Sequence, residues 1–444
     1  MGSGLFLQLL PSTLGGIAFA VPLLLAFVQI ATYAYNLFFH PLRKFPGPIT
    51  SAISNIPLTA AGLRGDGVYW IVDLHQRYGE VVRVAPNELS FSGNGAYRDI
   101  HGHKKAGLRT LEKDPQFYRT PSGERDIVNG DFDDHARMRR VFAHAFSDRA
   151  LKLQEPLFLT HVDKLIKNMR EALIQDRRHK FDMVQMWNFT NFDIMGDLTF
   201  GEPLGMLDKS SYHPWVQAML SSFKFGVYVH SIRHLPLIGR VPSLEGLLLR
   251  FCIPKKVLGQ MALHKNFSEQ RVDTRLEKQD ARPDMWGLVL EKEGQNGLTR
   301  QEMYSNANLF MIAGTETTAT LLSGLTYYLV THSTKLQKLT DEIRSTFSSE
   351  TEISIERLQA LPYLNACLEE SLRMEKKSGF SPFSTGPRAC LSKNMAYHEM
   401  RLILTKVLYN FDLELCEESQ SWIQHKIFIM WEKPPLYCRL RPVS

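Results

Sequence analysis

The chain has 444 residues and a formal net charge of +6; 44% of the residues are hydrophobic and 22% are charged. This is the composition of an ordinary globular protein that can bury a large core. Lys and Arg are spread along the chain without a basic arm, so no nucleic-acid partner is expected. The five irregularly spaced cysteines argue against a disulfide framework or a zinc site.

An apolar segment opens the chain. Residues 1–42 contain no Asp, Glu, Lys or Arg, and the apolar run 14–39 exceeds the roughly 20 residues that cross a bilayer. A cleaved signal peptide is the alternative, but a basic n-region is absent and the run is longer than an h-region. Arg43 and Lys44 fit a positive cytosolic flank. We therefore expect a single transmembrane anchor.

The apolar run is expected to form a helix, and the Pro-Gly-Pro sequence at residues 46–48 ends that helix. The expected organisation is an N-terminal membrane anchor, residues 1–40, and one domain behind it, residues 41–444. This arrangement predicts a single-pass membrane protein with the remaining chain in the cytosol.

Helical patterns dominate behind the anchor. Residues 80–92 contain two strand-like runs around a Pro-Asn turn, and residues 134–149 resemble one strongly basic helix. Thr299 and Glu302 form a T-x-x-E capping box, which predicts the start of a helix that runs to about residue 331.

The last third of the chain continues this pattern. Pro362 suits the first turn of a helix that carries Glu370 and Arg373. Residues 391–410 predict an amphipathic helix, and short strand-like pieces follow from Asp412. The predicted fold class is mainly α with a minor β-sheet (α+β).

Three residues in the middle of the long helix could carry chemistry. Gly314 costs about 0.8–1 kcal/mol of helix stability relative to Ala. Glu316 and Thr317 place a carboxyl and a hydroxyl in an otherwise apolar run. The simpler interpretation is a solvated polar face. The functional one is a gap opposite Gly314 that admits a ligand, with Glu316 and Thr317 managing protons.

The loop at residues 383–390 makes a stronger case. Gly386 and Pro387 predict a turn, Arg388 adds a permanent cation, and Cys390 stands at the start of the next helix. Helix N–H groups and the guanidinium would stabilise a thiolate there, as a soft metal ligand requires. A free cysteine in a surface turn is the alternative.

Other polar spacings are weak when taken alone. Glu370 and Arg373 form an i,i+3 pair of a kind that is common on exposed helices. His135 and Arg139 lie one turn apart, and the neighbouring arginines could form a solvated helix face.

The order of these signals is more specific than any one of them. The ordered set is the anchor with its Pro-Gly-Pro hinge, His135-x-x-x-Arg139, A-G-T-E-T-T at 313–318, E-x-x-R at Glu370 and Arg373, and F-x-x-G-x-R-x-C at 383–390. It resembles a cytochrome P450 over nearly the whole chain. DHARMRRVFAHAFSDRAL and CLSKNMAYHEMRLIL are similar to microsomal members from filamentous fungi, in particular secondary-metabolite hydroxylases similar to trichothecene hydroxylases.

The resemblance implies a haem b cofactor whose axial thiolate ligand is Cys390. Phe383 would lie near the sulfur, and Arg388 would pair with a haem propionate. Arg139, with His135 where the family usually has Trp, would meet the other propionate region.

The resemblance also implies that the distal side of the haem, where dioxygen binds, is lined by Gly314, Glu316 and Thr317. A basic face that includes Arg137 and Arg140 would dock an NADPH-cytochrome P450 reductase. The implied function is hydroxylation or epoxidation of a hydrophobic secondary metabolite with O2 and reductase-supplied electrons. A haem-thiolate isomerase or dehydratase, which needs no reductase, is disfavoured by the acid–alcohol pair.

Two departures from the family pattern stand out. Ser392 replaces the glycine of C-x-G, and only residues 374–382 separate E-x-x-R from the cysteine loop. The family has several dozen residues there, including strands and a second arginine that completes the E-x-x-R network. Nine extended residues span at most about 30 Å. We therefore expect an incomplete P450 fold with a break between Met374 and Glu375.

This break supports a second hypothesis of a different class. The chain would then be a non-catalytic truncated isoform, or the product of an erroneous gene model, that cannot assemble the haem site.

Overall fold

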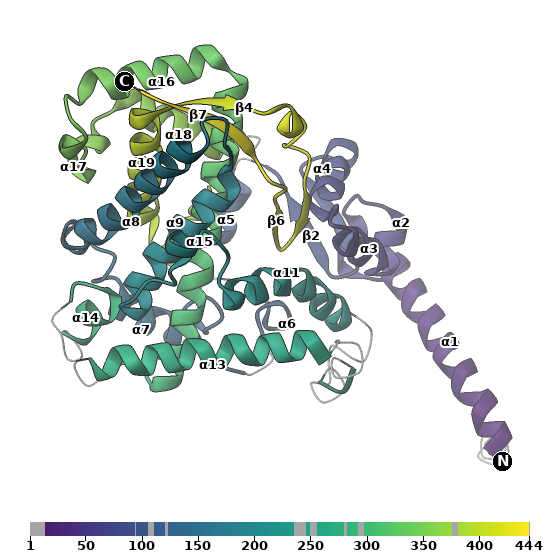
Figure 1. Cartoon of the computed structure of the whole chain (residues 1–444). Coiled ribbons are helices and arrows are strands. Elements are labelled where there is room, and N and C mark those ends of the chain that lie inside the picture. The colour runs from purple at the N-terminus through teal and green to yellow at the C-terminus, as the bar shows by residue number, and fades with distance from the viewer. Residues whose placement is uncertain are drawn as a thin grey trace, which may run out of the picture. The chain divides into compact units, whose positions relative to one another are not determined.

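The computed structural model describes residues 14–93, 95–104, 111–119, 123–234, 246–248, 255–278, 282–291, 297–374 and 381–443. The chain forms two compact units, Met1–Ala96 and Tyr97–Ser444 (Figure 1). The described parts are mainly helical with three small sheets, which confirms the predicted fold class.

The first unit begins with the apolar helix α1. One helix in the described residues, Ala20–Phe38 within α1, is long and apolar enough to cross a membrane. The β1–β2 hairpin confirms the two strands expected around Pro86 and Asn87. The elements of this unit are α1 (Leu14–Phe38), η2 (Pro41–Lys44), α2 (Ile49–Ile53), α3 (Ile56–Arg64), α4 (Gly67–Tyr78), β1 (Val81–Ala85) and β2 (Glu88–Phe91).

The helices that follow are built around a long central helix, α15. They are α5 (Ala96–His101), α6 (Pro115–Tyr118), α7 (Phe132–Phe142), α8 (Asp148–Gln175), α9 (Met183–Phe200), α10 (Met206–Lys209), α11 (Pro214–Arg233), α13 (Lys255–Glu277), α14 (Met285–Leu290), α15 (Arg300–Thr331), α16 (Ser333–Thr346), η3 (Glu350–Glu352), α17 (Ile355–Gln359), α18 (Pro362–Met374), η4 (Gly386–Arg388), α19 (Lys393–Asn410) and η5 (Glu417–Ser419).

Two antiparallel sheets complete the second unit. The first has the strand order β3 (Lys180–Asp182), β7 (Tyr437–Pro442), β4 (Phe411–Leu415). The second is a hairpin of β5 (Lys426–Phe428) and β6 (Met430–Glu432) with Ile429 at its turn. These strands confirm the short strand-like pieces expected near the C-terminus.

The core lies where α9, α15 and α19 meet (Figure 1). Nearly every residue of α9 is buried, which explains why this helix shows no polar face. Edge-to-face contacts between Phe142 and both Trp286 and Phe310 join α7, α14 and α15 within the same core. The core therefore fixes the helix that carries Gly314, Glu316 and Thr317.

The single basic helix expected at 134–149 is wrong. Helix α7 ends at Phe142, and a new helix, α8, begins at Asp148. The Ser147 hydroxyl accepts a hydrogen bond from the Ala150 backbone N–H at 3.2 Å, so this serine caps a second helix.

The other helix predictions are confirmed. The Thr299–Glu302 capping box is complete in both directions. Pro362 begins α18, and α19 begins at Lys393, two residues later than expected.

Candidate active site

A cluster of cations gathers beside the cysteine loop. Arg139 of α7 donates from Nη1 to the carbonyl oxygen of Ala389 at 2.6 Å, which ties the helix to the residue before Cys390. Arg388 donates from Nη2 to the Gly130 carbonyl oxygen at 3.0 Å. Its Nη1 is buried and has no hydrogen-bond partner among the described residues. The loop therefore presents an unsatisfied guanidinium N–H group.

His135 and Lys113 complete this cationic cluster. Burial, followed by the charges of Arg388, Arg139 and Lys113, lowers the pKa of His135 to about 4. Burial and repulsion from Arg388 also lower the pKa of Lys113 to about 8, against an opposing attraction from Asp126. Positive groups this close together repel one another, and a bound anion would reduce that repulsion. Lys113 was not predicted, because it stands alone in a loop without a motif.

Gly386 fixes the shape of the loop. Its φ is +77°, and a Cβ there would lie 2.1 Å from the His101 carbonyl oxygen. Only glycine adopts this left-handed conformation without cost and permits so close a backbone approach. The Cys390 N–H then donates to the Phe383 carbonyl oxygen at 2.7 Å, which closes the loop.

The thiol of Cys390 is exposed and free. The Ser392 hydroxyl lies 3.6 Å from its Sγ, and Ser392 is the residue that precedes α19. Phe383 lies against the ring of Tyr397, with centroids 5.2 Å apart. The helix thus starts three residues beyond the thiol, and the aromatic residue stands on the same loop.

The middle of α15 separates the residues expected to act as an acid–alcohol pair. Thr317 is exposed and donates to the Ala313 carbonyl oxygen at 2.6 Å, and Ala313 is exposed on the same face. Glu316 is buried and forms an ion pair with Lys433. Successive helical residues point about 100° apart, so the carboxyl and the hydroxyl face different surroundings.

Gly314 serves close helix packing. A Cβ at this position would lie 2.7 Å from Sδ of Met195, a residue of α9. The side of Gly314 where a side chain would stand is therefore filled by protein.

Lys433 is a site residue that the sequence analysis missed. Its ammonium group also donates to the Thr320 hydroxyl at 2.7 Å, one turn of α15 beyond Glu316. A lone lysine before two prolines carries no helical spacing, so no signal in the sequence points to it.

Glu370 and Arg373 form an exposed pair on α18. Arg373 Nε donates to Glu370 Oε2 at 2.6 Å, and the side chains are 67% (Arg373) and 50% (Glu370) exposed. The pair has no third polar partner among the residues that the structure describes. Residues 375–380 of the expected short link lie outside the described residues.

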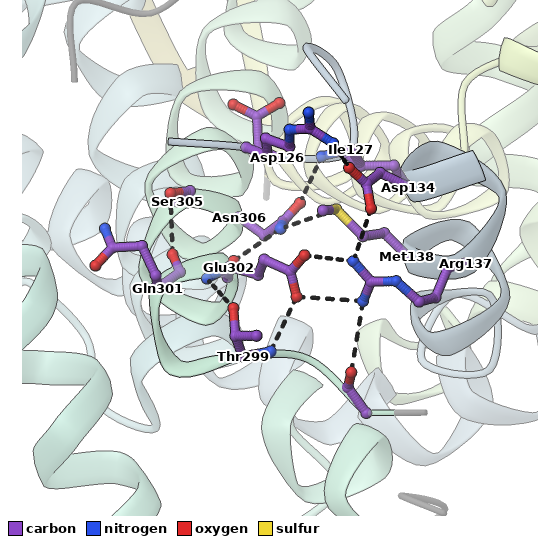
Figure 2. Close-up of polar contacts among 12 residues, drawn as sticks. Asp126, Ile127, Asp134, Arg137, Met138, Thr299, Gln301, Glu302, Ser305 and Asn306 are labelled. Atoms are coloured by element: carbon purple, nitrogen blue, oxygen red, sulfur yellow. Dashed lines mark hydrogen bonds and ion pairs between the residues drawn. The ribbon is translucent and has the colours of Figure 1, made fainter. Parts of the chain in front are cut away.

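Arg137, which is expected on a reductase-docking surface, is engaged in an ion pair within the protein, and its side chain is 29% exposed. Figure 2 shows its guanidinium turned toward the first turn of α15, where both terminal nitrogens bind the Glu302 carboxylate. A further contact joins Arg137 to Asp134 at 3.2 Å. Arg140, on the same helix, is exposed.

The described geometry defines a mainly helical protein with a thiol loop, a cationic cluster beside it and a central helix that exposes a hydroxyl. The sequence model "Cytochrome P450" matches residues 46–377 and 375–439. The chain belongs to the cytochrome P450 family, and its enzyme class is cytochrome P450 monooxygenase.

Similar relatives are fungal. The chain is 38% identical to cytochrome P450 monooxygenase efuB of Hormonema carpetanum over 486 residues, which cover 94% of this chain and 95% of the relative. It is 38% identical to cytochrome P450 monooxygenase FUM2 of Gibberella moniliformis, covering 90% and 98%. Cytochrome P450 monooxygenase astA of Talaromyces wortmannii is 36% identical, covering 93% and 95%.

The family implies a haem with a thiolate ligand, and the residues present fit that group. An exposed thiol suits iron. The unsatisfied Nη1 of Arg388 within the cationic cluster suits a propionate carboxylate. The exposed face of Ala313 and Thr317, in the middle of an otherwise buried helix, suits the edge of a ligand pocket.

Proposed function

We propose that this protein is a haem-thiolate monooxygenase of fungal secondary metabolism that hydroxylates or epoxidises a hydrophobic metabolite. Its co-substrate is O2, and its electrons come from NADPH-cytochrome P450 reductase. The observation that carries the proposal is the exposed thiol of Cys390 beside the cationic cluster, to which Arg139 is joined through the Ala389 carbonyl oxygen.

Four residues would hold haem b. Cys390 would supply the thiolate ligand, and Arg388 would offer its free N–H group to one propionate. Arg139 and His135 would meet the other propionate, where an anion would offset the cationic charges that, after burial, lower the pKa of His135. Phe383 would lie near the sulfur. When bound, the haem supplies the oxygen-activating chemistry, and the chain supplies ligation, orientation and proton handling.

The distal residues have separate tasks. The Thr317 hydroxyl stands on the exposed face of α15 and can hold a water molecule by a hydrogen bond. Gly314 lets α15 approach α9 closely, which sets the position of that face. Glu316 is the proton-handling carboxylate, held from behind by Lys433.

We also propose a single-pass location in the endoplasmic reticulum membrane. The anchor is residues 1–40, which contain α1, and the catalytic domain is residues 41–444 in the cytosol. The apolar length of α1 and the basic flank Arg43 and Lys44 support this orientation. Arg140, which is exposed on α7, is the residue of this helix that we propose for docking the reductase.

The missing segment between Met374 and Glu375 remains part of the proposal. Its support is that the alignment with efuB runs over 486 positions, more than the 444 residues of this chain. The family match also falls into two stretches that meet at residues 375–377. The exposure of Glu370 and Arg373 fits a lost third partner. These observations are what supports the alternative hypothesis, a chain that cannot assemble the haem site.

One experiment separates the two hypotheses. The full chain is expressed in membranes and reduced, and its carbon-monoxide difference spectrum is recorded. A red-shifted Soret band typical of thiolate ligation is expected. The variant C390S should lose it, and C367S, a cysteine on α18, should keep it. A second comparison uses the same chain with the corresponding segment of efuB inserted after Met374.

The outcomes are distinct. A band in the unaltered chain supports the monooxygenase. A band only after insertion, with both proteins present in the membrane, would show that the unaltered chain is non-catalytic. A band that survives C390S would overturn the assignment of the ligand.

A further inference from the structure

The pair of Glu316 and Lys433 is more deeply buried than the other ion pairs near the site. Both side chains are only 4% exposed, and the Lys433 ammonium also donates to the Thr320 hydroxyl at 2.7 Å. A buried carboxylate is tolerated only with such a counter-charge. Lys433 therefore fixes where the acid stands on α15.

The backbone around Lys433 is held rigidly. Pro434 and Pro435 follow it, and each proline restricts its own φ. The indole N–H of Trp422 donates to the Pro434 carbonyl oxygen at 2.8 Å. The lysine thus approaches Glu316 from a segment with little freedom to move.

The β5–β6 hairpin that precedes Lys433 is docked on α11. Ile429, at its turn, has a φ of +62°, which is unusual for a β-branched residue. A Cβ on Gly226 of α11 would lie 2.6 Å from Cδ1 of Ile429. Lys224 forms an ion pair with Glu432 and lies 5.2 Å from the ring centroid of Phe428. The side chain of Ile429 at the turn therefore lies directly against Gly226.

These elements line a cavity of about 380 Å³ that is open to solvent, between α9, α11, α15 and the hairpin. Glu316 lines it, and its Oε2 has no hydrogen-bond partner among the described residues. Asn188 also lines it, with Oδ1 likewise unpartnered. Both oxygens are themselves buried, so they lie behind the wall of the pocket. The pocket is therefore next to the oxygen of Glu316 that Lys433 leaves free, and unpartnered buried acceptors are the groups that buried water satisfies.

We propose that Lys433 is a positioning residue for Glu316. It holds Oε1 so that Oε2 lies beside the cavity, and the hairpin docked on α11 sets the place of Lys433. Protons then reach Glu316 from solvent through this cavity. The inference rests on the proposed role of Glu316 in proton handling.

The first test is independent of haem. Chemical unfolding of the full chain in detergent is followed for E316Q, K433M and the double variant. Each single change is expected to lower the denaturation midpoint, and the double variant should lose less than the sum of the two. Additive losses would overturn the positioning contact, whatever the chain's activity.

The second test measures turnover without an identified substrate. The reductase-coupled chain oxidises NADPH and reduces O2 with two electrons and two protons to hydrogen peroxide. K433M is expected to lower kcat about tenfold or more, because positioned acid–base groups contribute at least that much. The KM for O2 should stay within about twofold of the wild-type value, since a merely destabilised site would move both constants.

Matched variants sharpen this result. K433R should restore most of the turnover, because it keeps a cation in reach of Glu316. K152M, which breaks an exposed pair between α8 and α17, should behave like the wild type. Equal losses in K433M and K152M would overturn the proposal. If no variant turns over, the proposed function fails while the unfolding test still decides the contact.

The role of the hairpin is tested separately. G226A places a methyl group against Ile429 and should lower kcat as K433M does. I429A in the same chain should relieve the clash and recover turnover. A G226A variant with wild-type kcat would show that the docking of the hairpin does not set Lys433.

Discussion

Arg137 of α7 and Glu302 of α15 are joined by two parallel contacts, one of them from Nη1 to Oε2 at 3.2 Å. The same carboxylate accepts the Thr299 backbone N–H at 2.9 Å and so completes the helix cap (Figure 2). One side chain thus closes the first turn of α15 and holds the helix that carries His135 and Arg139.

Replacing this arginine should destabilise the fold. R137M leaves the buried Glu302 carboxylate without its charged partner. Hydrogen bonds of this type contribute about 1.5–3 kcal/mol. Urea unfolding should show a loss of that size. R140M, on the exposed face of the same helix, should stay within about 0.5 kcal/mol of the wild type. Equal losses would mean that the Arg137–Glu302 contact is not stabilising.

The same contact predicts a dependence on acid. Burial alone would raise the pKa of Glu302, but the hydrogen bonds from Arg137 and Thr299 and the charge of Arg137 outweigh it and leave the pKa below 4.5. Stability from a lowered pKa is fully present above the unfolded value and is lost as pH falls through the folded one. Melting temperatures between pH 6 and pH 3 should fall more steeply in the wild type than in E302Q. Parallel curves would contradict this.

Glu399 predicts the opposite trend. Complete burial on α19 raises its pKa to about 8, against a hydrogen bond from Thr318 that lowers it. The folded state therefore holds a proton that the unfolded state releases above about pH 4.5, so stability declines from there to about pH 8 and then levels off.

The variant E399Q removes this titration. Its melting temperature relative to the wild type should rise as pH increases from 5 to 8, and the difference should stay constant above that range. A difference that does not change with pH would show that Glu399 is ionised in the folded protein.

The thiol loop should tolerate no side chain at Gly386. G386A combines a left-handed φ, which costs about 1–2 kcal/mol, with a Cβ only 2.1 Å from a backbone oxygen. We expect loss of the carbon-monoxide band and a lower denaturation midpoint. G324A is the control, because nothing lies within 4 Å of its Cβ position on α15. It should gain about 0.5–1 kcal/mol. A fully active G386A would contradict the observed loop.

Much of the fold was readable from local signals. The capping box at Thr299, the proline at the start of α18 and the alternating segment of β1 and β2 each depend on neighbours within a few residues. The break between α7 and α8 was missed because a serine at position 147 is compatible both with the inside of a helix and with a helix N-cap. Its role as the cap of α8 follows only from the hydrogen bond that its hydroxyl accepts.

The site was predicted less completely, for a physical reason. Cys390 and Arg388 belong to one short motif, so spacing alone brings them together. Lys433 and Glu316 are 117 residues apart, and Arg137 and Glu302 are 165 apart. Which cation meets which carboxylate is decided by tertiary packing. A single sequence therefore names the charged residues without pairing them.

The contacts around Gly386 have a consequence for how the protein is made. The turn beside Cys390 rests on the carbonyl oxygen of His101, and Arg139 reaches Ala389 across 250 residues of sequence. Contacts between residues so far apart in the sequence form slowly, because the entropy of the long intervening loop is lost before the contact contributes any free energy. The thiol loop can form only after the ribosome has released nearly the whole chain. Until then α15 and its partners expose apolar surface of the kind that promotes aggregation.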